Sequence, residues 1–217
     1  MRVALIISAC CVLGYLLGNV SFARIFSAIN KKSIDSVGSG NPGTMNMLRN
    51  HGARLGVITL LFDALKGAIP ALTAYLLLGV NTTIGYIGLY SAGISAVLGH
   101  VYPVFYKFRG GKGIATTIGV FAVADPLVTL ALFLFIVLIV FFVKIGSLSS
   151  IILVVSFAII ESCKSINHNV VILILLYSIV FIDVFAHRAN IARLFSEEER
   201  ETDLISSIAK DIKKDNK

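Results

Sequence analysis

Two glycine-rich loops in this chain carry the residue types that proteins use to hold phosphate groups. Residues 38–49 read Gly-Ser-Gly-Asn-Pro-Gly-Thr-Met-Asn-Met-Leu-Arg. Glycine lets main-chain N–H groups approach an anion, serine and asparagine add short donors, and arginine supplies a bidentate clamp. The first loop is therefore a candidate phosphate site, although the same residue types also build ordinary surface turns.

The second loop, residues 99–113, ends in Arg-Gly-Gly-Lys-Gly and runs directly into an apolar segment. Lys112 and its neighbouring glycines would then lie at a helix N-terminus, where unpaired N–H groups and the helix dipole favour an anion. A nucleotide-binding Walker A motif would need glycine at 106 and serine or threonine at 113, but the chain has Tyr106 and Gly113. The loop predicts phosphate binding without a nucleotide; the alternative is a simple lysine at the membrane surface.

A third polar cluster follows the last apolar segment, in the stretch His-Arg-Ala-Asn-Ile-Ala-Arg-Leu at 187–194. On a continuing helix, His187, Asn190 and Arg193 are three residues apart and share one side. An imidazole, an amide and a guanidinium would converge there. A lone histidine at a membrane interface more often only extends toward water. This cluster therefore indicates a binding site mainly because the other two clusters are predicted on the same face.

Acidic residues are few, and their spacing suits pairing better than chemistry. Asp63 and Lys66 stand one helical turn apart within an apolar run, which predicts an ion pair facing the bundle interior. Asp183, near the end of the last apolar segment, is expected to partner an arginine or histidine. No two carboxylates are spaced for metal or glycosidase chemistry, and the three cysteines have no metal-ligand spacing. We therefore expect no metal, no cofactor and no disulfide.

Composition places these clusters on a membrane protein. The 217 residues are 57% hydrophobic and only 14% charged, whereas soluble domains carry roughly 25% charged residues. A span needs ~20 mostly apolar residues. Asp125-Pro126 divides one overlong apolar run, because proline removes a donor and disfavours helix before it. The expected spans are 3–25, 55–78, 84–98, 114–124, 126–143, 145–160 and 169–186.

Charge sets the expected topology. Basic residues gather in three regions, residues 24–54, residues 107–112 and residues 188–217. If all three lie in the cytoplasm, an even number of crossings must separate the second from the third. The division at Asp125-Pro126 satisfies this, so we predict an all-α polytopic membrane protein of seven helices, with the N-terminus outside and the C-terminus cytoplasmic. Spans 114–124 and 145–160 are short enough to be re-entrant instead.

Two regions are expected in the chain, a transmembrane domain at 1–195 and a charged tail at 196–217. In the tail, Leu204, Ile208 and Ile212 recur every fourth residue among charges. This pattern indicates an amphipathic helix at the membrane interface, with a solvated, partly frayed tail as the alternative.

The three motifs together resemble the bacterial acyl-phosphate:glycerol-3-phosphate acyltransferase family. The resemblance rests on GSGNPGTMNMLR at 38–49, GHVYPVFYKFRGGKGIAT at 99–116, HRANIARL at 187–194 and LFDALKG at 61–67. It implies a multi-pass enzyme of the bacterial inner (plasma) membrane with its active site at the cytoplasmic face. The reaction implied moves a fatty acyl group from acyl phosphate to the 1-position of glycerol 3-phosphate, giving lysophosphatidic acid and phosphate.

The resemblance also implies roles for particular residues. Ser39, Asn41 and the surrounding glycines would hold acyl phosphate, whereas Arg49 would bind glycerol 3-phosphate together with the catalytic set. That catalytic set is Lys112, His187 and Asn190. The further substrate-binding residues are Gly38, Gly40, Gly43, Asn46, Gly110, Gly111 and Gly113. No cofactor, metal or nucleic acid is expected as a partner, and either His187 or the donor's own phosphate would take the proton.

This chain departs from the family pattern at two places. The family usually reads Gly-Ala-Thr-Asn where this chain has Gly43-Thr44-Met45-Asn46, and it usually has glycine where Glu197 stands. An alternative function is an organic-phosphate transporter or channel, because basic residues and helix N-termini also line anion pathways. Against transport, the basic residues lie at one membrane edge, and no repeated half is evident.

Overall fold

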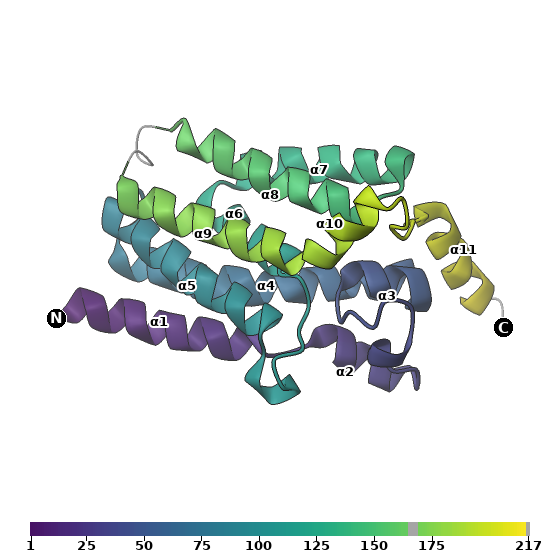
Figure 1. The fold of residues 1–217 in the computed structure, drawn as a ribbon. Coiled ribbons are helices and arrows are strands. Elements are labelled where there is room, and N and C mark those ends of the chain that lie inside the picture. Colours follow the sequence, from purple (N-terminus) through teal and green to yellow (C-terminus); the bar gives the residue numbers. More distant parts are fainter. Residues whose placement is uncertain (165–168, 216–217) are drawn as a thin grey trace.

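The structure is a computed structural model that describes residues 1–164 and 169–215, and within these ranges it contains helices and no strands (Figure 1). Lys217 of the basic tail lies outside the described residues. The principal helices are α1 Arg2–Gly18, α2 Phe22–Ile29, α3 Thr44–His51, α4 Ala53–Leu78, α5 Thr83–Val101, α6 Ile114–Ala124, α7 Pro126–Val143, α8 Gly146–Ser162, α9 Val170–Ala186, α10 Arg188–Phe195 and α11 Leu204–Asp215. Two 3-10 turns, η1 Ile34–Ser36 and η2 Val104–Tyr106, lie in the first and second loops.

Within the described residues, four segments are long and apolar enough to cross a membrane: Arg2–Ile29, Ala53–Leu78, Thr83–Tyr106 and Pro126–Val143. A fifth results if α9 and α10, which meet at an angle of 56°, count as one span. The helices α6 and α8 are apolar but shorter. The expected first span, 3–25, is interrupted, because the chain leaves helical geometry between α1 and α2 and Ser21 is extended there.

Glycines set the closest helix contacts in the bundle. An added Cβ at Gly119 of α6 would lie 1.8 Å from the main-chain oxygen of Ala64 in α4, and one at Gly67 would lie 2.1 Å from that of Thr116. Gly18 of α1 also packs closely on α5, because an added Cβ at Gly18 would lie 2.3 Å from the main-chain oxygen of Ala96. The bundle therefore brings α6, and the loop before it, against the middle of α4.

The remaining core is apolar and centred on α5, α6, α8 and α9. The rings of Phe121 and Phe157 stack with centroids 3.8 Å apart, which joins α6 to α8. At the end of α6, Asp125 caps α7 by accepting from the Val128 N–H, which fits the proline that follows it. Lys164 pairs with Asp125 and with buried Glu161, so an ion cluster joins the α6–α7 turn to the end of α8.

The tail forms the helix α11, which lies outside the end of the bundle opposite the N-terminus (Figure 1). It packs against α3 and α4. The expected amphipathic helix therefore exists, and it rests on the protein itself.

Candidate active site

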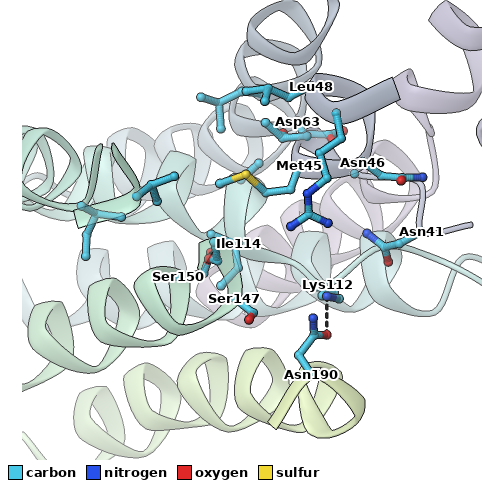
Figure 2. Close-up of a pocket in the computed structure, with 18 of the residues that line it drawn as sticks. Asn41, Met45, Asn46, Leu48, Asp63, Lys112, Ile114, Ser147, Ser150 and Asn190 are labelled. Carbon is cyan, nitrogen blue, oxygen red and sulfur yellow. Dashed lines mark hydrogen bonds between the residues drawn. The ribbon is translucent and has the colours of Figure 1, made fainter. Parts of the chain in front are cut away.

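A single cavity of about 360 Å³ lies where α3, α4, α6, α7, α8, α10 and α11 meet. One part of its wall is polar and comes from all three sequence motifs (Figure 2). The other part is apolar and comes mainly from α4 and α7, with Val57, Leu60, Phe133, Val137 and Val140. The chamber can thus accept a molecule that is polar at one end and hydrocarbon at the other.

Lys112 and Asn190 join the second motif to the third. The Lys112 ammonium donates a hydrogen bond to Oδ1 of Asn190 (Figure 2). The Asn190 amide nitrogen donates in turn to Oε1 of Glu199, which also accepts from Ser147 at 3.1 Å. Arg193 donates to Oε2 of the same carboxylate at 2.9 Å. Glu199 therefore orients the amide so that its oxygen faces the lysine.

Burial disfavours the charged forms of both Lys112 and Glu199. It lowers the pKa of Lys112 to about 8, with Arg193 and Arg49 adding to the effect and Glu199 opposing it. Burial opposes ionisation of Glu199, but hydrogen bonds from Asn190, Ser147 and Arg193 outweigh it and lower the pKa of Glu199. Lys112 is therefore a cation near neutral pH that a neighbouring anion stabilises.

His187 stands at the bend between α9 and α10, and its side chain is buried. Its Nδ1 lies 2.7 Å from the main-chain oxygen of Asp183. Because a carbonyl can only accept, Nδ1 carries the proton and Nε2 keeps its lone pair. Burial and the Lys112 charge lower the pKa of His187 to about 4, so the ring is neutral near pH 7.

Asn46 organises the first loop. Its side-chain oxygen accepts from the Ser39 N–H at 3.1 Å, and its amide donates to the main-chain oxygen of Val37 at 3.1 Å. Ser39 Oγ accepts from the Asn41 N–H at 3.3 Å. The loop is thereby folded against α3, and Ser39 and Asn41 both line the cavity.

Arg49 reaches the cavity from α3 and contacts the tail. Its Nε donates to Thr202 Oγ1 at 3.0 Å, and its Nη2 donates to Thr202 Oγ1 and to the main-chain oxygen of Arg200. Sequence patterns on either side of this contact give no sign of it, because 153 residues separate its partners.

The structure divides the expected site residues into two groups. Nine of them line the cavity: Ser39, Asn41, Gly43, Asn46, Arg49, Lys112, Gly113, His187 and Asn190. Gly38, Gly40, Gly110 and Gly111 do not line it. Gly110 and Gly111 instead pack on His100, whose main-chain oxygen accepts from the Gly111 N–H at 3.1 Å. Substrate binding by any of these residues stays a prediction.

Gly113 begins α6 with φ of +91°, a left-handed value that favours glycine. An added Cβ there would lie 2.2 Å from Asp183 Oδ1. Asp183 thus touches the second motif through its carboxylate and the third through its main-chain oxygen. We expected its carboxylate to partner an arginine or histidine, but in the structure the contact with His187 is made by the main chain.

The expected pair of Asp63 and Lys66 is confirmed, with 2.9 Å between Oδ1 and Nζ and both side chains buried. Lys66 also donates to the main-chain oxygen of Val20 at 2.8 Å, just after α1. Asp63 and His100 line the cavity, whereas Lys66 points toward the break between α1 and α2. The pair therefore ties the first membrane segment to the bundle beside the site.

Sequence reasoning missed Glu199 and Ser147. Glu199 sits in a run of three glutamates that looks like a solvated surface segment. The only available signal was that Glu199 follows the HRANIARL motif by five residues, which allows the carboxylate to fold back onto Asn190 but does not require it.

Comparison with known proteins now gives the family. The family model described as "Glycerol-3-phosphate acyltransferase" matches residues 8–197. The chain belongs to this family. The glycerol-3-phosphate acyltransferase of Aquifex aeolicus is 35% identical over 188 residues, covering 87% of this chain and 95% of the relative. That of Paraburkholderia phytofirmans is 35% identical over 191 residues, covering 87% of each chain.

Solved structures of the family share the fold. The glycerol 3-phosphate form of PlsY, an integral membrane glycerol 3-phosphate acyltransferase, superposes with a TM-score of 0.83 at 33% identity, covering 92% of this chain and 97% of PlsY. Its lysophosphatidic acid form superposes with a TM-score of 0.81 at 32% identity, covering 94% of this chain and 98% of PlsY. This member of the acyltransferase family is therefore a multi-pass membrane protein, with helices and no strands in the part of the chain that the structure describes.

Proposed function

We propose that this chain transfers a fatty acyl group from acyl phosphate to the 1-position of glycerol 3-phosphate, releasing lysophosphatidic acid and inorganic phosphate. One observation carries the proposal: a single cavity joins a cationic wall, with Lys112 and Arg49, to an apolar wall between α4 and α7. Both substrates bear phosphate, and one bears a hydrocarbon chain. The family names support acyl transfer to glycerol 3-phosphate, and the chemistry of the site supports an acyl phosphate donor.

The donor choice follows from what the site can activate. An acyl phosphate is a mixed anhydride with a good leaving group, so transfer needs no serine or cysteine nucleophile. Positioning two substrates and stabilising developing negative charge suffice. Lys112, placed immediately before α6, and Gly113 at the helix N-terminus supply that stabilisation. Ser39 and Asn41, which line the polar part of the same cavity, would hold the acyl phosphate.

The proposed step balances without a cofactor. The 1-hydroxyl oxygen of glycerol 3-phosphate bonds to the acyl carbonyl carbon, the bond from that carbon to the phosphate oxygen breaks, and phosphate leaves with the electron pair. The proton of the hydroxyl goes to the leaving phosphate. His187, with a pKa of about 4, is a weak base near neutral pH. It accepts a hydrogen bond from the hydroxyl through Nε2 and so orients it.

We further propose seven membrane crossings, with α6 and α8 as short spans, the N-terminus outside and the site at the cytoplasmic face of the bacterial inner membrane. Figure 1 supports this orientation, since the start of α1 lies at the end of the bundle opposite α3, α10 and α11. Arg49, Arg193 and Lys210 all belong to that second end. Residues 1–195 would form the membrane domain and residues 196–217 the charged tail.

Purified protein mixed with acyl phosphate and glycerol 3-phosphate tests the proposal. Phosphate and lysophosphatidic acid should appear in equal amounts, and acyl coenzyme A should not replace the donor. Liposomes holding the protein provide the opposing measurement. Uptake of glycerol 3-phosphate without product formation would identify a transporter and overturn the proposal.

A further inference from the structure

The segment after residue 199 is built into the site although the family match ends at residue 197. Thr202 is fully buried, and its N–H donates to the main-chain oxygen of Lys144 at 2.7 Å, at the end of α7. Leu204 and Ile208 of α11 line the cavity. The segment thus spans from the end of α7 to the start of α4 and covers one side of the chamber.

The contact with the tail uses the nitrogen atoms of Arg49 that would bind a phosphate. A guanidinium binds phosphate bidentately through one of two edges, the Nε and Nη2 edge or the Nη1 and Nη2 edge. Both edges use Nη2. In the structure, Nη2 donates to Thr202 Oγ1 and to the Arg200 main-chain oxygen, and Nε donates to Thr202 Oγ1 as well. Neither edge is open to a phosphate while these contacts hold.

Further contacts hold the segment in this position. Asp211 Oδ2 accepts from the Arg54 N–H at 2.7 Å, at the start of α4, and Lys210 donates to the main-chain oxygen of Arg49. The outward face of α11 keeps Ile205 and Ile212 exposed, at 65% and 57% of their surfaces. The helix is therefore held by a few polar contacts and a narrow apolar stripe, which suits a segment that detaches.

We propose that residues 200–212 are an autoinhibitory lid that competes with substrate phosphate for Arg49 and covers the side of the cavity that Leu204 and Ile208 line. The proposal rests on the proposed function, because it takes Arg49 as a ligand of glycerol 3-phosphate. Binding of that phosphate releases Thr202 and the Arg200 oxygen from the guanidinium, and α11 then leaves the chamber so that the acyl chain enters.

Kinetics of full-length variants provide the first test. Thr202→Val removes the acceptor and keeps the shape, and Thr202→Ser keeps the acceptor. Asp211→Ala removes the anchor on α4, and its matched control, Glu201→Ala, removes a carboxylate from an exposed position of the same segment. A ligand that binds only the open form has an apparent affinity reduced in proportion to the fraction of protein that is open. Both Thr202→Val and Asp211→Ala should raise that fraction. The KM for glycerol 3-phosphate should therefore fall by about threefold to tenfold.

The two controls should keep the wild-type KM, and kcat should not fall in Asp211→Ala. An unchanged or higher KM in both Thr202→Val and Asp211→Ala would overturn the lid, because it would mean that the tail supports the site. Asp211→Ala decides the matter by itself if Thr202→Val does not fold, since Asp211 does not line the cavity and accepts from the Arg54 N–H at the start of α4.

Amide hydrogen exchange of the wild-type protein separates the lid from the proposed reaction. Glycerol 3-phosphate, or inorganic phosphate at higher concentration, should speed exchange in residues 202–212, and Thr202→Val should show fast exchange without ligand. Slower or unchanged exchange with both phosphates would refute the lid even in an active enzyme. Faster exchange in a preparation without acyl transfer would instead retain the lid and refute the proposed function.

Discussion

Lys112 Nζ and Asn190 Oδ1 are hydrogen-bonded across 78 residues of sequence. This contact joins the loop before α6 to the helix after α9, so neither motif is placed independently of the other. Because Glu199 holds the opposite end of the Asn190 amide, the lysine faces an acceptor that cannot rotate away without losing a charged partner. Lys112 is thus held in place before substrate arrives.

Replacing Lys112 with methionine should weaken glycerol 3-phosphate binding. A hydrogen bond to a charged group contributes about 1.5–3 kcal/mol, so the KM should rise roughly tenfold to a hundredfold. Lys107→Met, at an exposed position of the same loop, is the matched control and should leave the KM unchanged. Steady-state kinetics with varied glycerol 3-phosphate measure both, and equal behaviour of the two variants would remove Lys112 from the site.

The pKa of Lys112 predicts a pH dependence above neutrality. The group is charged below pH 8 and loses its proton as pH rises through about 8, so phosphate affinity should fall there. The KM for glycerol 3-phosphate should therefore rise between pH 7.5 and 9 by about tenfold per unit once the lysine is largely neutral, since one proton is lost. A KM that stays flat to pH 9.5 would contradict the assignment, and Lys112→Met should abolish the rise.

His187→Ala tests who takes the proton. If the leaving phosphate takes it, as proposed, the variant should lose kcat by a factor that does not change between pH 6 and 9, because the neutral ring does not titrate in that range. A rate loss that vanishes at higher pH would make the imidazole the general base. A loss confined to KM would show that the ring only binds substrate.

Removing one member of the buried Asp63–Lys66 ion pair should destabilise the protein more than removing both. Lys66→Met leaves a buried carboxylate without its partner and should cost ~3–5 kcal/mol of unfolding free energy. The double variant Asp63→Leu with Lys66→Met should recover most of that loss, because no charge is then left buried. Thermal unfolding in detergent measures both, and additive losses in the double variant would contradict the pairing.

Gly119→Ala should separate α4 from α6. Its new methyl group would lie 1.8 Å from the Ala64 main-chain oxygen, and backbone cannot move aside as a side chain can. Gly88→Ala is a suitable control, because its nearest neighbour is the tip of the flexible Leu78 side chain. The first variant should lower the unfolding temperature and the activity together, whereas the second should stay near wild type.

Local sequence patterns were enough to predict many of the helices and some of the side-chain contacts. The pairing of Asp63 with Lys66 follows from helical spacing, as does the shared side of His187, Asn190 and Arg193. The apolar segments predicted the helices, because each needs only its own residues to satisfy its backbone in a membrane. The break between α1 and α2 was missed, since its apolar residues continue the hydropathy pattern across the change of backbone angles.

Residue types and spacing within one helix or loop were enough to predict the membrane setting and the three polar motifs, and the resemblance of those motifs gave the family. Helix packing was needed to show that Gly110 and Gly111 pack on His100 and that the Glu199 carboxylate holds Asn190. It also decided that Thr202 engages Arg49 from 153 positions away. Such contacts depend on how distant helices pack, and no local spacing records the shape that packing takes.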